Sequence, residues 1–374
     1  MFVYITLFLL VVGMGLLVRN REYVKFHISL PKRGEQLQNG MDRQRAVNIC
    51  CAVAIFILLA AVSACRIAVG NDYWGYRFQF NLIMQGRHVS YEWGFNLVVW
   101  VIQSLLGYDN YLPVFAVFSI ATAFFFVKAM YDQGEWFGAT VFLLMTNGYY
   151  YSSLNSVRYY FALAVAMYAM KYVLRRQYGI FILWICFAAC FHKSILVVIP
   201  IYLAAHWLAE HKLNKYLYLA GGAFLASMLL FQNFYRRIIF FFYPYYEGSV
   251  FDKVDFSVTN IAKCIGVLVL CLVFYKTAIR DHIQNRFYFF LNLAGLATYT
   301  CGSFIPEVSR IGYYMIVSQI FLIPGVLIRI EKKGWRIFWT AGVGIAFLGY
   351  FALFLHSAYD TSIRLLPYLN WIFD

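Results

Sequence analysis

Long apolar blocks recur along the whole chain, and they constrain its fold more than any other feature. Thirteen such blocks, most of them 15 to 20 residues long, are separated by short polar or charged segments. A helix needs about 20 mainly apolar residues to cross the roughly 30 Å of hydrocarbon in a bilayer. Lipid offers the backbone no hydrogen bonds, so spanning segments are helices or closed barrels, and blocks of this length favour helices. We therefore predict an all-α fold, a polytopic integral membrane helical bundle.

Composition argues against a water-soluble globule. Of the 374 residues, 63% are hydrophobic and 13% charged, whereas soluble domains average about 25% charged residues. The net charge of +14 lies in short loops between apolar blocks, so we interpret it as topogenic and in part functional. The bilayer is the expected partner, and nucleic acid is not.

Basic residues mark every second loop, which predicts the orientation of the blocks. Segment 19–45 is predicted as a basic cytoplasmic loop, and segments 67–90 and 232–260 as external loops. Counting crossings from the two chain ends gives results that differ by one. The shortest and most polar block, 91–106, is therefore predicted to be re-entrant or interfacial. The prediction is about 12 transmembrane helices plus this segment, in a single domain spanning 1–374.

Ionisable residues at the external edge of the membrane are the candidates for function. Charge near hydrocarbon costs about 2.5 to 3.5 kcal/mol unless something offsets it. A first cluster lies around the sequences GNDYWGYRFQF and SYEWGF. It contains Arg66, Asp72, Tyr73, Tyr76, Arg77, Arg87, His88 and Glu92. Cations, carboxylates and aromatic faces in one place suit a site for sugar and phosphate.

Arg158 stands at the start of an otherwise apolar helix, in the sequence NSVRYYFALAVAMYAMKY. Asn155 and Ser156 precede it as expected caps. A cation near the amino end of a helix opposes the macrodipole, so it needs an anion nearby. A guanidinium beside exposed helix amides would suit a pyrophosphate. The alternative is an arginine that extends to the interface with no chemical role.

Two further clusters carry ionisable residues. His192, in CFHKS, lies between two apolar blocks. It could act as a base, as an acid or as a hydrogen-bond donor to phosphate. A structural histidine is the alternative. Glu307 and Arg310, in GSFIPEVSRIGYY, lead into another helix, and a simple ion pair between them is the alternative to a ligand site.

Several catalytic signatures are absent from the sequence. It has no GxxxxGK[ST], no GxGxxG after a strand, no HExxH, no paired-aspartate metal motif and no GxSxG. Cytosolic nucleotide chemistry is therefore not indicated, and neither a metal nor another cofactor is predicted.

The four clusters, in this order, resemble the EpsG-like branch of the Wzy polysaccharide polymerases. These are membrane proteins that polymerise lipid-linked repeat units of bacterial exopolysaccharide, capsule or O-antigen. The resemblance is carried by RIAVGNDYWGY, which begins at Arg66, then Glu92, then NSVRYYFALAVAMYAMKY continuing to FHKSILVVIP, and finally SRIGYYMIVSQIFLIP. Family members commonly have Arg-Gln where this chain has Arg158-Tyr159, so a glutamine contact is not carried over.

The resemblance implies a glycosyltransferase of the bacterial inner (cytoplasmic) membrane with its active site facing the periplasm or exterior. Its substrate would be an undecaprenyl-pyrophosphate-linked oligosaccharide, and a chain-length regulator and a flippase of the same pathway would be partners. The candidate bases are His192, Asp72 and Glu92, and the candidate pyrophosphate ligands are Arg158, Arg310, Arg66 and Arg77. The candidate sugar contacts are Tyr73, Trp74, Tyr76, Asn155, Tyr159 and Glu307.

Other functions stay open at this point. A lipid-linked oligosaccharide flippase or transporter would place its charges in a central cavity, and the sequence shows no paired halves of the kind common in transporters. An O-antigen ligase-like transferase would share the donor chemistry. An acyltransferase that uses a cytosolic donor would need polar catalytic groups on the cytoplasmic side, and a scaffold would need no chemistry.

Overall fold

All named elements of the structure are helical, which confirms the predicted all-α class. The computed structural model describes residues 1–19, 43–107, 110–212, 215–242, 244–249, 252, 254, 256–359 and 363–372. Most of the predicted basic loop 19–45 lies outside the described residues. Among the described residues, five helices can cross a membrane by length and composition, namely Arg43–Ala64, Leu112–Gln133, Lys193–Glu210, Val308–Leu327 and Lys333–Ser357. Several shorter helices are also apolar. The chain is therefore a multi-helix membrane protein, and the number of crossings stays a prediction.

The helices group into two compact units, which are described separately. Unit 1 comprises Met1–Leu196 and Lys332–Asp374, and unit 2 comprises Val197–Glu331. The helices of unit 1 are α1 (Phe2–Leu17), α2 (Arg43–Ala64), α3 (Asp72–Met84), α4 (Trp93–Leu106), α5 (Leu112–Gln133), α6 (Phe137–Thr146), α7 (Tyr149–Ser152), α8 (Val157–Leu174), α9 (Tyr178–Ala189) and α17 (Lys333–Ser357). Those of unit 2 are α10 (Val198–Glu210), α11 (Lys215–Leu230), α12 (Gln232–Phe242), η2 (Pro244–Tyr246), α13 (Val258–Val273), η3 (Tyr275–Ile279), α14 (Ile283–Cys301), α15 (Val308–Ile316) and α16 (Gln319–Leu327). The short η1 (Lys193–Val197) spans the boundary.

Helix α8 forms the core of unit 1. Every residue of α8 is buried except Arg158 and Tyr172, and both α5 and α9 pack against it. Small side chains in the run ALAVAMYAM allow neighbouring helices to approach closely. We call the end of unit 1 at which α8 begins (Val157) end A, and the end at which α8 stops (Leu174) end B.

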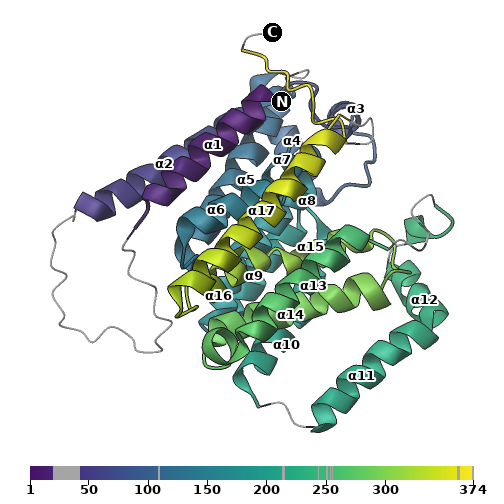
Figure 1. Cartoon of the computed structure of the whole chain (residues 1–374). Helices are drawn as coiled ribbons and strands as arrows, with labels where there is room; N and C mark the ends of the chain where they lie inside the picture. Colours follow the sequence, from purple (N-terminus) through teal and green to yellow (C-terminus); the bar gives the residue numbers. More distant parts are fainter. Residues whose placement is uncertain are drawn as a thin grey trace, which may run out of the picture. The chain divides into compact units, whose positions relative to one another are not determined.

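The start of α1 and the carboxyl tail up to residue 372 lie at end A, together with the segment that follows α2 (Figure 1). The Tyr4 hydroxyl donates to the carbonyl of Leu365 over 2.9 Å. The backbone N–H of Ile67 donates to the carbonyl of Leu369 over 3.0 Å. The carboxyl tail is thus bonded to the stretch that leads into α3.

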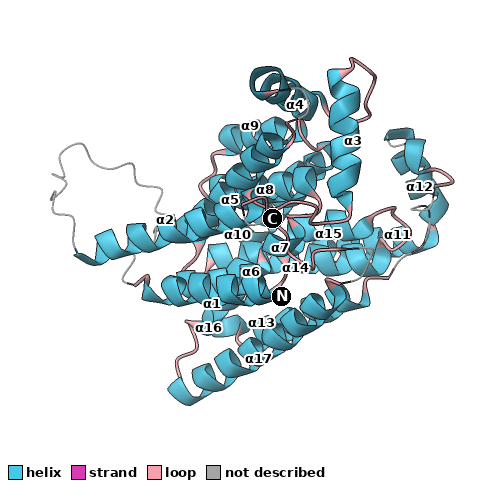
Figure 2. Ribbon diagram, turned by 90° about the horizontal axis from the view of Figure 1, so that it is seen from above, coloured by secondary structure: helices cyan, strands magenta, loops and turns pink. Residues whose placement is uncertain are grey.

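The chain lies at end A both before and after α4. The first residue of α4 follows Glu92, which pairs with Arg158 at the start of α8. Beyond its last residue, the ring of Tyr111 lies 6.0 Å from that of Tyr73, near the start of α3. Helix α4 therefore does not carry the chain from end A to end B. Seen from above, α3 and α4 lie toward one side of unit 1, and α1 and α17 lie toward the other (Figure 2).

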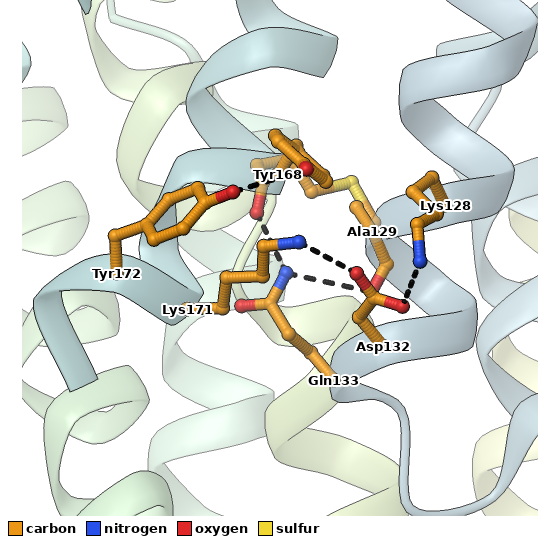
Figure 3. A network of polar contacts seen from close by, with 8 residues as sticks. Lys128, Ala129, Asp132, Gln133, Tyr168, Lys171 and Tyr172 are labelled. Atoms are coloured by element: carbon orange, nitrogen blue, oxygen red, sulfur yellow. Dashed lines mark hydrogen bonds and ion pairs between the residues drawn. The ribbon is translucent and has the colours of Figure 1, made fainter. Parts of the chain in front are cut away.

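A network of charged side chains joins α5 to α8 at end B (Figure 3). One carboxylate oxygen of Asp132 pairs with Lys128 Nζ, and the other pairs with Lys171 Nζ, each over 2.6 Å. The Lys171 ammonium also lies 3.7 Å from the ring centroid of Tyr168, and the Tyr168 and Tyr172 hydroxyls are 3.1 Å apart. The network fixes the register of α5 against α8.

In unit 2, α14 packs against α10, α13, α15 and α16. Buried polar groups join three of these helices. Asn292 on α14 donates to the carbonyl of Cys264 over 3.1 Å and accepts from Gln319 Nε2 over 2.7 Å. The predicted external segment 232–260 holds α12 and η2, and Arg236 of α12 pairs with Asp252.

Candidate functional site

Arg158 and Glu92 form the centre of a polar cluster at end A. They make an ion pair in which the two side chains are only 15% and 14% exposed. The second carboxylate oxygen of Glu92 accepts the backbone N–H of Lys193 over 3.0 Å. The same oxygen lies 3.9 Å from His192 Nδ1. Three segments that are distant in sequence thus bring a cation, a carboxylate and an imidazole together.

A close contact between α4 and the residues after α9 sets the position of Glu92. The backbone N–H of Gly94 donates to the carbonyl of Cys190 over 3.0 Å. A Cβ at Gly94 would lie 2.8 Å from that oxygen, so only glycine allows this approach. Glu92 is the N-cap residue of α4, but its side chain does not cap the helix. Its carboxylate instead reaches across to Arg158.

Aromatic rings surround the Arg158 guanidinium. Its Cζ lies 3.6 Å from the ring centroid of Tyr91 and 5.4 Å from that of Phe95. Such cation–π contacts are stronger where water is excluded. Burial raises the pKa of Tyr91 to about 12, so this phenol stays neutral at pH 7. Tyr159, a predicted sugar contact, is 3% exposed and packs edge to face on His192 at 5.5 Å.

Asp72 connects the start of α3 to the start of α8. Its backbone N–H donates to Asn155 Oδ1, and its carboxylate accepts from the Ser156 hydroxyl, both over 2.8 Å. The predicted capping of α8 by the Ser156 side chain is therefore wrong, because this hydroxyl is bonded to Asp72. Gly70 has φ +92°, and a Cβ there would lie 2.8 Å from Asn155 Cα. The turn before α3 thus packs directly on the residues that lead into α8.

Arg66 lies beneath the cluster, fully buried. Its guanidinium donates to the carbonyls of Ser63 and Leu154 and, over 2.9 Å, to the hydroxyl of Ser119. Burial lowers the pKa of Arg66 to about 10, so it remains a cation at pH 7. A substrate cannot reach this side chain in the present arrangement. Its contacts instead hold the segment that leads into Arg158.

The other predicted residues of α3 divide into an exposed and a buried set. Trp74 and Arg77 are exposed, and the Arg77 guanidinium lies 4.7 Å from the ring centroid of Tyr111. Tyr73 and Tyr76 are 1% and 6% exposed. Only Trp74 and Arg77 of these four can therefore meet a ligand without rearrangement.

Arg310 and Glu307 lie in unit 2. Arg310 Nε is 2.9 Å from Glu307 Oε2, and the side chains are 39% and 21% exposed. Glu307 is the N-cap residue of α15, with φ 54°. The ion pair that the sequence left as an alternative is therefore present.

Some members of the cluster were not predicted as site residues. Tyr91 and the backbone N–H of Lys193 contact Arg158 and Glu92 directly. Both are sequence neighbours of predicted residues, and Tyr91 could have been found as the aromatic residue beside Glu92. A backbone N–H has no signal in the sequence.

The fold and the cluster define a class, namely a multi-helix membrane protein with a cation, carboxylates and an imidazole gathered at one end of a helical unit. The model of the EpsG family matches residues 49–370, most of the chain, and the protein belongs to that family. Membership indicates a role like that of a polysaccharide polymerase. No curated protein matches the chain. No solved structure matches it either.

Proposed function

We propose that the protein joins undecaprenyl-pyrophosphate-linked oligosaccharide repeat units into a surface polysaccharide, on the outer side of the bacterial inner membrane. The observation that carries the proposal is the partly buried Arg158, paired with Glu92, whose other carboxylate oxygen lies 3.9 Å from His192 Nδ1. Arginine can bind two phosphate oxygens at once, and donors of this kind stabilise charge that develops on a leaving group.

The proposed reaction is one displacement at the anomeric carbon of the growing glycan. A hydroxyl of the incoming repeat unit forms the new C–O bond, and the bond from the anomeric carbon to pyrophosphate breaks. The electron pair leaves with undecaprenyl pyrophosphate, next to Arg158. The hydroxyl proton passes to a base, for which Glu92, His192 and Asp72 are the candidates. Glu92 is the one in direct contact with Arg158.

The remaining predicted residues take supporting roles in this proposal. Trp74 and Arg77 are exposed on α3 and are available to sugar rings and phosphate. Arg66, Tyr73 and Tyr76 are buried and position the exposed groups. Arg310 and Glu307 of unit 2 remain candidates for a second anion or sugar contact.

The orientation belongs to the same proposal, with end A external. The basic residues Arg175 and Arg176 follow α8 at end B, which supports a cytoplasmic end B by the positive-inside rule. Glu92 and Tyr111, which flank α4, both lie at end A, and this supports the re-entrant or interfacial prediction for 91–106.

The test is polymerisation by the purified chain in nanodiscs, supplied with undecaprenyl-pyrophosphate-linked repeat units. We expect a ladder of products spaced by one repeat unit, and its loss in Arg158→Ala. Arg175→Ala, at the exposed other end of α8, is the matched control and should keep the ladder. Transfer to a lipid A core without a ladder would indicate a ligase. Substrate crossing vesicles without transfer would indicate a flippase.

A further inference from the structure

The Glu92 carboxylate occupies the position that an external anion would take beside Arg158. We infer that Glu92 is an internal anion of this site, and that a pyrophosphate group binds by displacing it. The inference rests on the proposed function only in taking Arg158 as the phosphate ligand. In addition, Glu92 competes with the phosphate for Arg158, and the Lys193 backbone N–H is a second donor to the phosphate. Displacement of Glu92 comes before proton transfer.

The donors around Glu92 are those that a phosphate needs. One carboxylate oxygen pairs with the Arg158 guanidinium, and the other accepts the Lys193 backbone N–H over 3.0 Å. Arginine and backbone N–H groups are the usual partners of bound phosphate oxygens. Two anions cannot share these donors at close range without strong repulsion. A phosphate and Glu92 therefore exclude each other.

The surroundings hold the cation more firmly than the carboxylate. The Arg158 guanidinium lies against the rings of Tyr91 and Phe95. Its Nε is buried and has no hydrogen-bond partner among the described residues, so the guanidinium has a donor left for a ligand with several oxygens. Glu92 precedes α4 in extended conformation and makes no cap bond to it. Its side chain can therefore turn away without breaking the helix.

Displacement of Glu92 would favour ligands that carry more than one negative charge. A singly charged ligand gains little binding free energy, because it replaces the Glu92 carboxylate by an anion of equal charge. A pyrophosphate carries more charge and more acceptor oxygens, so it gains more from the same donors. The released Glu92 carboxylate then lies near the reacting groups without its cation, where it can accept the hydroxyl proton.

The experiment measures binding of inorganic pyrophosphate to the full chain in nanodiscs by isothermal titration calorimetry. Glu92→Gln keeps the shape and an acceptor for the Lys193 N–H but removes the charge. We expect it to bind pyrophosphate about tenfold more tightly than the wild type, because a competing like charge is gone. Glu331→Gln, which removes an exposed carboxylate, is the control and should leave affinity unchanged.

Three further variants make the result decisive. In Arg158→Ala, pyrophosphate should bind weakly, and adding Glu92→Gln should not restore tight binding. Glu92→Asp is too short by one methylene to reach both donors, so it should bind more tightly than the wild type even if Glu92→Gln does not fold. Glu92 variants that bind pyrophosphate no better than the wild type would overturn the inference.

The polymerase proposal fails separately from this inference. If the wild-type chain makes no ladder but Glu92→Gln still binds pyrophosphate more tightly, the polymerase function is overturned and the internal anion stands. If the ladder forms and the Glu92 variants leave affinity unchanged, the internal anion is overturned and the polymerase function stands.

Discussion

Arg66 and Leu154, 88 positions apart in the chain, are joined by a hydrogen bond of 3.1 Å from the guanidinium Nε to the backbone carbonyl. Leu154 lies three residues before the start of α8. A buried cation that follows α2 thus fixes the segment that leads into Arg158. The bond links the packing of unit 1 to the geometry of its candidate site.

Replacing Arg66 should destabilise the protein. Arg66→Ala leaves the carbonyls of Leu154 and Ser63 without a buried donor, and we expect a loss of about 3 kcal/mol or more. Arg66→Lys keeps the charge but cannot reach all three acceptors, so its loss should be intermediate. Thermal unfolding in detergent measures both. Arg77→Ala, at an exposed position, is the control. Equal melting temperatures for Arg66→Ala and Arg77→Ala would contradict the prediction.

Gly70→Ala should disturb the contact between α3 and the start of α8. The residue has a positive φ, and the new Cβ would lie 2.8 Å from Asn155 Cα. We expect a cost of about 1 to 3 kcal/mol. Gly75→Ala, within α3, meets nothing within 4 Å and should stabilise the helix by up to about 1 kcal/mol. Equal melting temperatures for the two variants would argue against this packing.

Asp132→Asn should weaken the join between α5 and α8 at end B. Lys171 is 6% exposed, and without the carboxylate its charge is buried unpaired, at a cost of about 3 to 5 kcal/mol. The double variant Asp132→Asn with Lys171→Met removes that charge and should recover part of the stability. Lys128→Met should cost less, since Lys128 is 42% exposed. A double variant no more stable than Asp132→Asn would show that the pair is not coupled.

Single cysteines should reveal which segments share a side of the membrane. In a chain whose native cysteines are replaced, we expect cysteine at Asn110 to react with an impermeant maleimide from the same side as cysteine at Asn71, because both positions lie at end A. Cysteine at Arg176 should react only from the opposite side. Reaction of the Asn110 position together with the Arg176 position would mean that α4 crosses the membrane.

The sequence predicted the helical class and the polar residues that gather at end A. Hydropathy sufficed for the class, because blocks long enough to cross lipid have few other folds open to them. Charged residues at the membrane edge are costly, so the sequence alone marks Glu92, Arg158 and His192 as candidates. The spacing of four residues on one helix also indicates the pair of Lys128 and Asp132. No local pattern in the sequence indicates their third partner, Lys171.

Only the tertiary structure decided which of these residues meet. Glu92 and Arg158 are 66 positions apart, and no local pattern joins them. Arg66 was expected in the site, yet it is fully buried below it. The physical reason is that a helix in lipid is apolar on nearly all sides, so its sequence does not mark which face packs against a neighbour. The sequence by itself determined the class, the family resemblance and the candidate groups, while helix packing decided the ion pair, the buried supports and the bonding of the carboxyl tail.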